Sequence, residues 1–146
     1  VPNVGIIIGS SSLLVIDTGM GARNADTIMG EMNRIPAARG KAIYIASTHF
    51  HPEHDLGAHA FPAGSKMIRS RDEEADIAQY GLAAARLFAA RSALNAELLK
   101  DVAFRPADIS FDREYRLDLG GADLPGRETR PSDCALPCWR TRRVCR

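Results

Sequence analysis

The sequence has little of what marks disulfide-framework, membrane or nucleic-acid-binding proteins. It holds three cysteines, an odd number, all after residue 133, so no complete internal disulfide framework follows. No apolar run approaches the roughly 20 residues that a membrane helix needs. The net charge is +1, so the bulk charge gives no reason to expect nucleic acid or an anionic membrane as a partner.

The chain also lacks an initiator methionine and a basic-then-apolar signal segment at its start. We therefore expect a processed product or a fragment, and the sequence assigns it no compartment. Its 146 residues are enough for one domain with a single core. Its composition, 45% hydrophobic and 25% charged, is ordinary for a soluble globular protein.

The apolar pattern of the first 46 residues predicts strands, a helix and a further strand. Two short apolar runs, at 4–9 and 13–16, flank a serine turn and predict a hairpin of buried strands. Helical spacing over 24–35 follows, with Asn24 as the expected N-cap and Pro36 at the exit. A strand is expected over 42–46, which completes the signature of an α/β layered domain.

The pattern is weaker beyond the centre of the chain. We expect a short strand at 66–69, one or two helices over 72–101 with a break near Gly81, and a turn followed by a strand over 111–119. The helical stripe of Leu87, Leu94 and Leu98 is expected to pack in the core. Residues 122–146 hold six Arg, three Pro and all three Cys without periodicity, and we expect them to form an irregular, non-native or disordered tail.

All four histidines fall in one short window directly after the strand expected at 42–46. His49 and His51 are two residues apart, which puts both rings on one face of an extended segment. His54 returns to the same side after a turn, and Glu53 adds a carboxylate. Such a mixed nitrogen and oxygen set suits zinc, and iron or manganese also accept it. His59 lies outside the tight spacing, so for it we expect a structural role.

The segment from His49 to His54 resembles the His-x-His-x-Asp-His motif of the metallo-β-lactamase superfamily. The Asp17-Thr18-Gly19 turn after an apolar strand is also similar to that family, as are residues 106–112 and 117–121. The resemblance covers about residues 4–121. It implies an α/β fold, a metallo-β-lactamase-like αββα sandwich, of which residues 1–121 form only the N-terminal half and 122–146 form the aberrant tail.

The resemblance also implies a site and a reaction. His49 and His51 would bind a first zinc ion, and Glu53 and His54 a second, with Asp17 orienting the ligand loop by hydrogen bonds. Two ions about 4 Å apart would share a hydroxide that attacks the carbonyl of a small-molecule substrate. The substrate classes are a β-lactam, a thioester, a lactone or a related ester.

Two departures from the family pattern leave alternatives open. Glu53 stands where the family has Asp, and its longer side chain moves the carboxylate by on the order of 1.5 Å. The second metal would then bind more weakly, or Glu53 would act as a base. No histidine follows His59, so the family's later ligands are absent. The alternative function is therefore a truncated, catalytically inactive fragment with weak or no metal binding, which self-associates through an exposed half-domain face.

Overall fold

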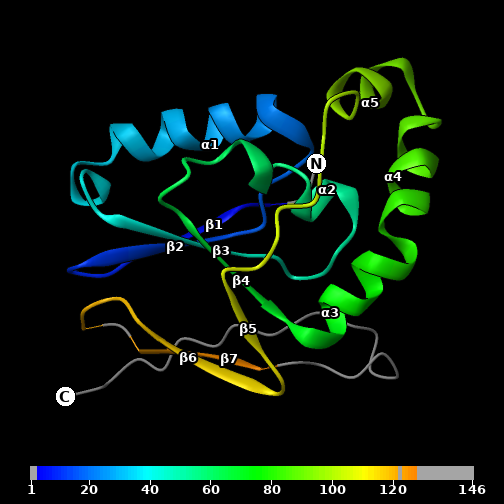
Figure 1. The fold of residues 1–146 in the computed structure, drawn as a ribbon. Helices are drawn as coiled ribbons and strands as arrows, with labels where there is room; N and C mark the ends of the chain where they lie inside the picture. Colours follow the sequence, from blue (N-terminus) through cyan, green and yellow to red (C-terminus); the bar gives the residue numbers. More distant parts are fainter. Residues whose placement is uncertain (1–2, 122, 128–146) are drawn as a thin grey trace.

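The computed structural model describes residues 3–121 and 123–127, and it places one main sheet between helices and a second, smaller sheet (Figure 1). The main sheet has the strand order β1-β2-β3-β4-β5. β1 is antiparallel to β2, and β2 to β5 are parallel to one another. The strands span Gly5–Ile8, Ser12–Ile16, Ala42–Ala46, Lys66–Ser70 and Ile109–Phe111. Because β2, β3 and β4 are parallel neighbours, the loops that follow them meet at the carboxyl ends of these strands.

The predicted hairpin is confirmed, since β1 pairs with β2 across a turn at residues 9–11. β2 is the buried strand of the two, and β1 is half-buried because it forms the edge of the sheet. The strand predicted over 42–46 is also confirmed, with the same bounds. Short runs of β-branched and apolar residues between turns therefore predicted this part of the sheet.

Helix α1, Gly21–Arg34, covers one face of the sheet and begins three residues before the predicted start. The prediction that Asn24 is the N-cap is wrong. The cap position is Met20, and the Asn24 side chain, one turn inside the helix, accepts a hydrogen bond from the Met20 backbone N–H at 2.9 Å. The buried side of the helix is the predicted one, with Ala25, Ile28 and Met32 against the sheet.

The segment expected as one or two helices forms an arm of several short pieces. It contains α3, a single π-helical turn, α4 and α5. Helical backbone continues through Gly81, so the break predicted there is wrong, and the helix is interrupted only at residues 90–92, before α5. The bounds are Arg71–Asp76, Ile77–Gly81, Leu82–Ala89 and Ala93–Leu98. The predicted core packing of Leu87 and Leu94 is wrong, because their exposed fractions are 68% and 58%. The arm extends beyond the sheet (Figure 1), so its helical stripe has no sheet face to pack on.

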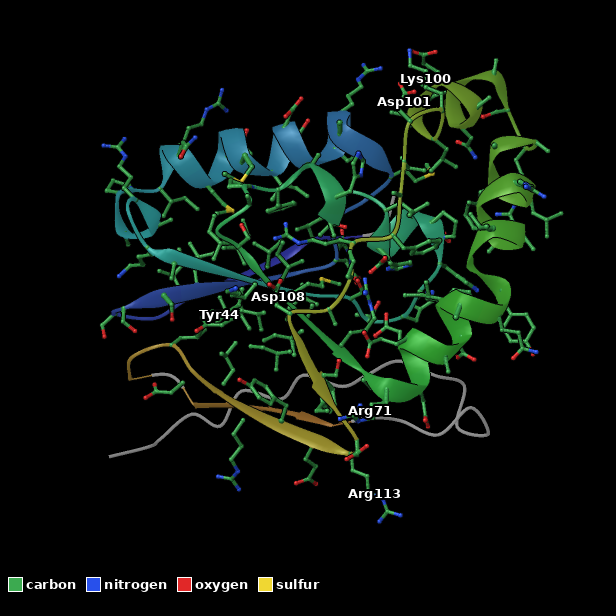
Figure 2. All side chains as sticks on the ribbon, in the orientation of Figure 1. Tyr44, Arg71, Lys100, Asp101, Asp108 and Arg113 are labelled. Carbon is green, nitrogen blue, oxygen red and sulfur yellow. The ribbon has the colours of Figure 1, made fainter. Side chains whose placement is uncertain are left out.

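The other face of the main sheet packs against the second sheet, which consists of β6, Glu114–Asp118, and β7, Asp123–Arg127. Leu117 and Leu119 reach a cluster that includes Leu14 and Ile68 of the main sheet. Figure 2 shows side chains filling the space between the main sheet and α1 and the space between the two sheets. Tyr44 lies on the side of the second sheet. β7 lies within the segment predicted to be irregular, so at 123–127 that expectation is wrong. Residue 122 and residues 128–146 of that segment lie outside the described part of the chain.

Two short 3₁₀ turns complete the described elements, at Pro36–Ala38 and Ala58–Ala60. The second packs against α1 and helps to close the core on that side of the sheet. No helix in residues 3–121 and 123–127 is long and apolar enough to cross a membrane.

Gly57 offers a direct test of how closely the loop after β3 packs on the turn after β2. A Cβ atom at Gly57 would clash with the Thr18 carbonyl oxygen and lie 2.8 Å from its carbonyl carbon. Because both atoms belong to backbone, we expect Gly57→Ala to lower the free energy of unfolding by about 1–3 kcal/mol. Gly64→Ala is the matched control, since nothing lies within 4 Å of its Cβ position. Urea unfolding measures both, and equal stability of the two variants would contradict the close approach.

Candidate metal centre

The histidine segment lies at the carboxyl end of β3, as predicted, and turns into the short helix α2, Pro52–Asp55. His51 precedes a proline, which favours extended backbone, and its φ and ψ are −63° and 145°. Pro52 then starts the helix, where its missing N–H costs nothing. This change from extended to helical backbone brings His54 back toward His49.

Three of the predicted ligands come together as side chains. The ring centroids of His49 and His51 are 4.5 Å apart, and those of His49 and His54 are 4.1 Å apart. His51 is the exposed member of the cluster, and the other two rings are half-buried. The three histidines that the sequence spacing predicted to group together therefore lie in one cluster.

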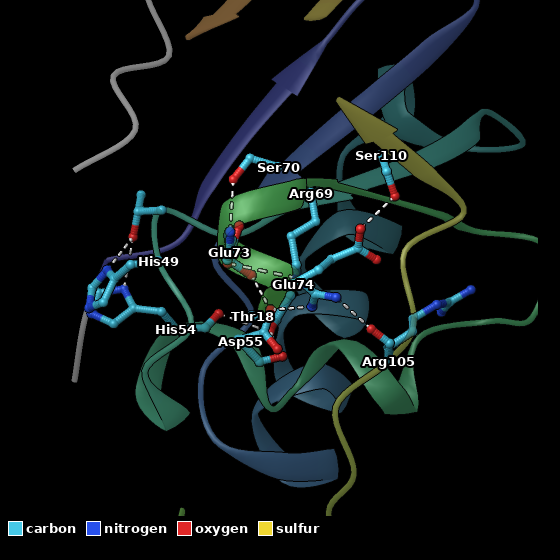
Figure 3. Close-up of polar contacts among 12 residues, drawn as sticks. Thr18, His49, His54, Asp55, Arg69, Ser70, Glu73, Glu74, Arg105 and Ser110 are labelled. Atoms are coloured by element: carbon cyan, nitrogen blue, oxygen red, sulfur yellow. Dashed lines mark hydrogen bonds and ion pairs between the residues drawn. The ribbon is translucent and has the colours of Figure 1, made fainter. Parts of the chain in front are cut away.

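Asp17 holds two of these histidines in a defined tautomer. Its Oδ1 accepts hydrogen bonds from the Thr48 backbone N–H at 2.7 Å and from the Thr48 hydroxyl at 2.9 Å. Its Oδ2 lies 2.8 Å from Nδ1 of His54, and because a carboxylate only accepts, that nitrogen carries the proton. The Thr48 hydroxyl uses its one hydrogen in the bond that it donates to Asp17. Its oxygen, 3.1 Å from Nδ1 of His49, therefore accepts a hydrogen bond from that nitrogen. Nδ1 is thus the bonded nitrogen of both rings, and the two rings lie side by side (Figure 3).

The donor chemistry of the cluster fits a metal ion. Burial, and then the neighbouring His54 and His51, lower the pKa of His49 to about 4, so its ring is neutral at pH 7 as a metal ligand must be. Oε2 of Glu53 is buried and has no hydrogen-bond partner among the described residues. The geometry fits less well, since no group of three or more His, Cys, Asp or Glu side chains in the described part of the chain is placed to hold a metal ion.

His59, for which a structural role was expected, makes a local contact. Its Nδ1 lies 2.7 Å from the carbonyl oxygen of Leu56, one helical turn earlier. That carbonyl accepts the Nδ1 proton, so the ring stabilises the 3₁₀ turn at Ala58–Ala60.

The turn after β2 forms hydrogen bonds with the backbone of α2 on one side. The Thr18 backbone N–H donates to the carbonyl of His54 at 2.7 Å, and the Thr18 hydroxyl lies 3.0 Å from the carbonyls of His54 and Asp55. The Gly57 N–H donates to the Gly19 carbonyl at 2.7 Å. These contacts satisfy polar groups at the end of a helix too short to satisfy them itself.

A buried ion pair holds α2 on the other side, and the sequence did not predict it. Asp55 is fully buried, and its Oδ1 accepts from Nη2 of Arg69 at 2.6 Å and from the hydroxyl of Ser47. Arg69, at 2% exposure, also donates from Nη1 to the carbonyl of Arg105 at 2.7 Å (Figure 3). The signal that could have found the pair is a charged residue inside the apolar run of β4.

Glu73 places a second acidic side chain beside this buried pair. Its Oε1 lies 3.8 Å from Nε of Arg69, too far for a hydrogen bond. Burial raises the pKa of Glu73 from 4.5 to about 8, an effect that Arg69 opposes and Asp55 reinforces. At neutral pH Glu73 therefore keeps its proton, and the charges of Asp55 and Arg69 balance each other.

Replacing Arg69 tests whether the buried pair is desolvated. Arg69→Met leaves Asp55 buried without a cation, and we expect the free energy of unfolding to fall by about 3–5 kcal/mol. Arg71→Met is the matched control on the next element (Figure 2). Arg71 pairs with Asp112 while both are exposed, at 65% and 83%, so its loss should cost less than about 1 kcal/mol. Similar losses in urea unfolding of the two variants would contradict the buried pair.

The proton on Glu73 predicts a pH dependence of stability. The folded state keeps this proton between pH 4.5 and about 8 while the unfolded state has lost it, so stability falls as pH rises across that window. Glu73→Gln imitates the neutral carboxyl and should remove this part of the slope in urea unfolding at successive pH values. Glu31→Gln, on an exposed pair with Arg34, should keep the parent's slope. An unchanged slope in Glu73→Gln would show that Glu73 is ionised in the folded chain.

No family model matches this sequence, and no curated protein matches it. Its fold is similar to those of many solved structures, and three of low sequence identity illustrate the likeness. The first is the native FEZ-1 metallo-β-lactamase from Legionella gormanii, with a TM-score of 0.66 at 15% identity over 93% of this chain and 49% of that one. The second is BJP-1, a subclass B3 metallo-β-lactamase of Bradyrhizobium japonicum, with a TM-score of 0.62 at 18% identity over 94% of this chain and 49% of that one.

The third is the stereoselective inverting sec-alkylsulfatase Pisa1 from Pseudomonas sp., with a TM-score of 0.62 at 16% identity over 86% of this chain and 24% of that one. The chain thus spans about half the length of the two β-lactamases and about a quarter of the alkylsulfatase. The described chain therefore has the metallo-β-lactamase fold, over a stretch that corresponds to about half of such an enzyme.

Proposed function

We propose that this chain is part of a metal-dependent hydrolase of the metallo-β-lactamase superfamily, acting on a small-molecule substrate. The observation that carries the proposal is the histidine cluster, with His49 and His54 presenting Nε2 at the carboxyl end of β3. Its position in a fold shared with two metallo-β-lactamases and an alkylsulfatase supports the assignment. A site at the loops that follow parallel strands is also where α/β proteins place their chemistry.

The predicted ligands divide into two pairs. His49 and His51 would hold one zinc ion, and Glu53 and His54 a second, with iron or manganese as alternatives to zinc. When bound, zinc supplies Lewis acidity for a carbonyl group and a water acidic enough to ionise near neutral pH. Asp17 supports this role by keeping the proton of His54 on Nδ1, because the other ring nitrogen must stay unprotonated to bind a metal.

Glu53 has two roles open to it. Its buried Oε2 has no hydrogen-bond partner among the described residues, so it is available either as a ligand or as a base that accepts a proton from water. A β-lactam, thioester, lactone or related ester fits the carbonyl chemistry expected of the fold. The likeness to an alkylsulfatase adds sulfate esters to the classes that a substrate screen should include.

A second candidate is a chain that binds metal weakly or not at all and has no activity by itself. The observation that favours it is the lack of any three-donor group placed to hold a metal ion within residues 3–121 and 123–127. Under this candidate, the histidine cluster would keep its hydrogen bonds to Asp17 and Thr48 and act only as part of the fold.

Zinc content distinguishes the two candidates. For the hydrolase we expect close to two zinc ions per metal-repleted chain by elemental analysis, and almost none in His51→Ala, because an exposed ligand is lost without disturbing the core. His59→Gln is the matched control and should keep the parent's zinc, since His59 bonds Leu56 instead. Unchanged zinc in His51→Ala would refute the site. Little zinc in the parent would favour the inactive chain, and oligomeric mass measured alongside would test self-association.

A further inference from the structure

Helix α4 lies beside the histidine cluster as well as beyond the sheet. The ring of Phe88 is centred 6.1 Å from the ring of His51, the exposed member of the cluster. Figure 1 shows α4 next to α2. The residue before α4, Gly81, packs closely on Phe104, since a Cβ atom there would lie 2.7 Å from the Phe104 ring. A substrate that reaches His51 would therefore meet α4 as one wall of the site.

The turn that follows α4 carries a cation held in a defined position. The guanidinium carbon of Arg91 lies 3.8 Å from the centre of the Phe88 ring, which is a cation–π contact. Arg91 lies in the turn after α4, where its backbone N–H donates to the Phe88 carbonyl at 3.2 Å, so the turn brings the two residues together. We call these two side chains the Arg91–Phe88 stack. The contact reduces the freedom of a long side chain before any ligand arrives.

The charge of Arg91 is not balanced by a carboxylate in the described part of the chain, where no ion pair involves it. Residues 77–96 contain no Asp or Glu, and their only charges are Arg86 and Arg91. Two large apolar side chains of α4, Leu82 and Leu87, are exposed at 70% and 68%. Residues 77–96 of the arm are thus apolar and cationic beside a cluster of metal-ligand type.

We propose that the Arg91–Phe88 stack binds the anionic group of a substrate with an apolar body whose reacting bond lies at the histidine cluster. The planar guanidinium suits a carboxylate or a sulfate, because both present two oxygens to its fork of N–H groups. Phe88 contacts the apolar body between the two ends. This assignment rests on the proposed hydrolase function and names the substrate class: small amphiphilic anions, in preference to neutral esters of the same shape.

The test measures binding without metal and without turnover, so it does not depend on zinc. The probes are phenylacetate and phenylacetamide, which have the same shape but differ in charge. They are titrated into the full chain in EDTA at about pH 8, where ordinary histidines are neutral. NMR follows the ring protons of His51 and Phe88. We expect phenylacetate to bind about threefold more tightly, the scale of one partly exposed ion pair.

Variants on α4 and on the turn after it show which side chain causes the preference. Arg91→Gln should bind both probes equally, and Phe88→Leu should reduce the preference because the guanidinium loses its support. Arg86→Gln removes the charge within α4 and should keep the parent's preference. Equal binding of the two probes by the parent, no binding of either, or an undiminished preference in Arg91→Gln would overturn the proposal. Unchanged backbone spectra show that these surface variants remain folded.

The outcomes separate this inference from the proposed function. If phenylacetate is preferred through Arg91 while the parent holds no zinc, the anion site stands and the hydrolase assignment of this chain fails. If the parent holds zinc through His51 while the probes bind equally, the hydrolase assignment stands and Arg91 has no part in substrate choice.

Discussion

The Asp17 carboxylate is the contact on which the rest of the site depends. It stands at the end of β2 in left-handed backbone, with φ of 64°, a conformation that Asp tolerates better than most side chains. From there it accepts from both donors of Thr48 and from His54, so it joins the end of β2 to the loop after β3. The same bonds set which nitrogen of each ring carries a proton. One carboxylate thus fixes both the position of the histidines and their tautomers.

Beneath the histidines, the short helix α2 is held in place from two strands. Thr18, after β2, bonds its carbonyls, and Arg69, on β4, bonds the buried Asp55. A buried ion pair contributes little net stability, because removing two charges from water offsets most of their attraction. Its effect is on position: a charge as deeply buried as Asp55 has one place in the fold where it is balanced. The extra carboxylate of Glu73 is compatible with this balance only while it is protonated.

How much the sequence predicted follows the range of the interactions involved. The strands at 12–16 and 42–46 and the grouping of His49, His51 and His54 depend on neighbouring residues, so local patterns predicted them. The Asp55–Arg69 pair joins residues 14 apart in sequence, and neither residue shows locally that the other is its partner. Leu87 has the spacing of a core residue, and only the path of the arm beyond the sheet exposes it. The tertiary arrangement decided both cases.

The two sides of the candidate site differ in how freely they can change. The histidine side is set by buried charges and backbone hydrogen bonds, so a substitution there leaves a buried group without its partner. The α4 side is exposed and held by a few contacts, and such elements open more readily than a core strand. Substitutions at Arg91 or Leu87 would therefore change what the site binds at little cost to the fold. Under the proposed function, that division would place the chemistry on the sheet and the choice of substrate on the arm. Arg91, in the turn after α4, would then have more bearing on substrate than any residue beneath the histidines.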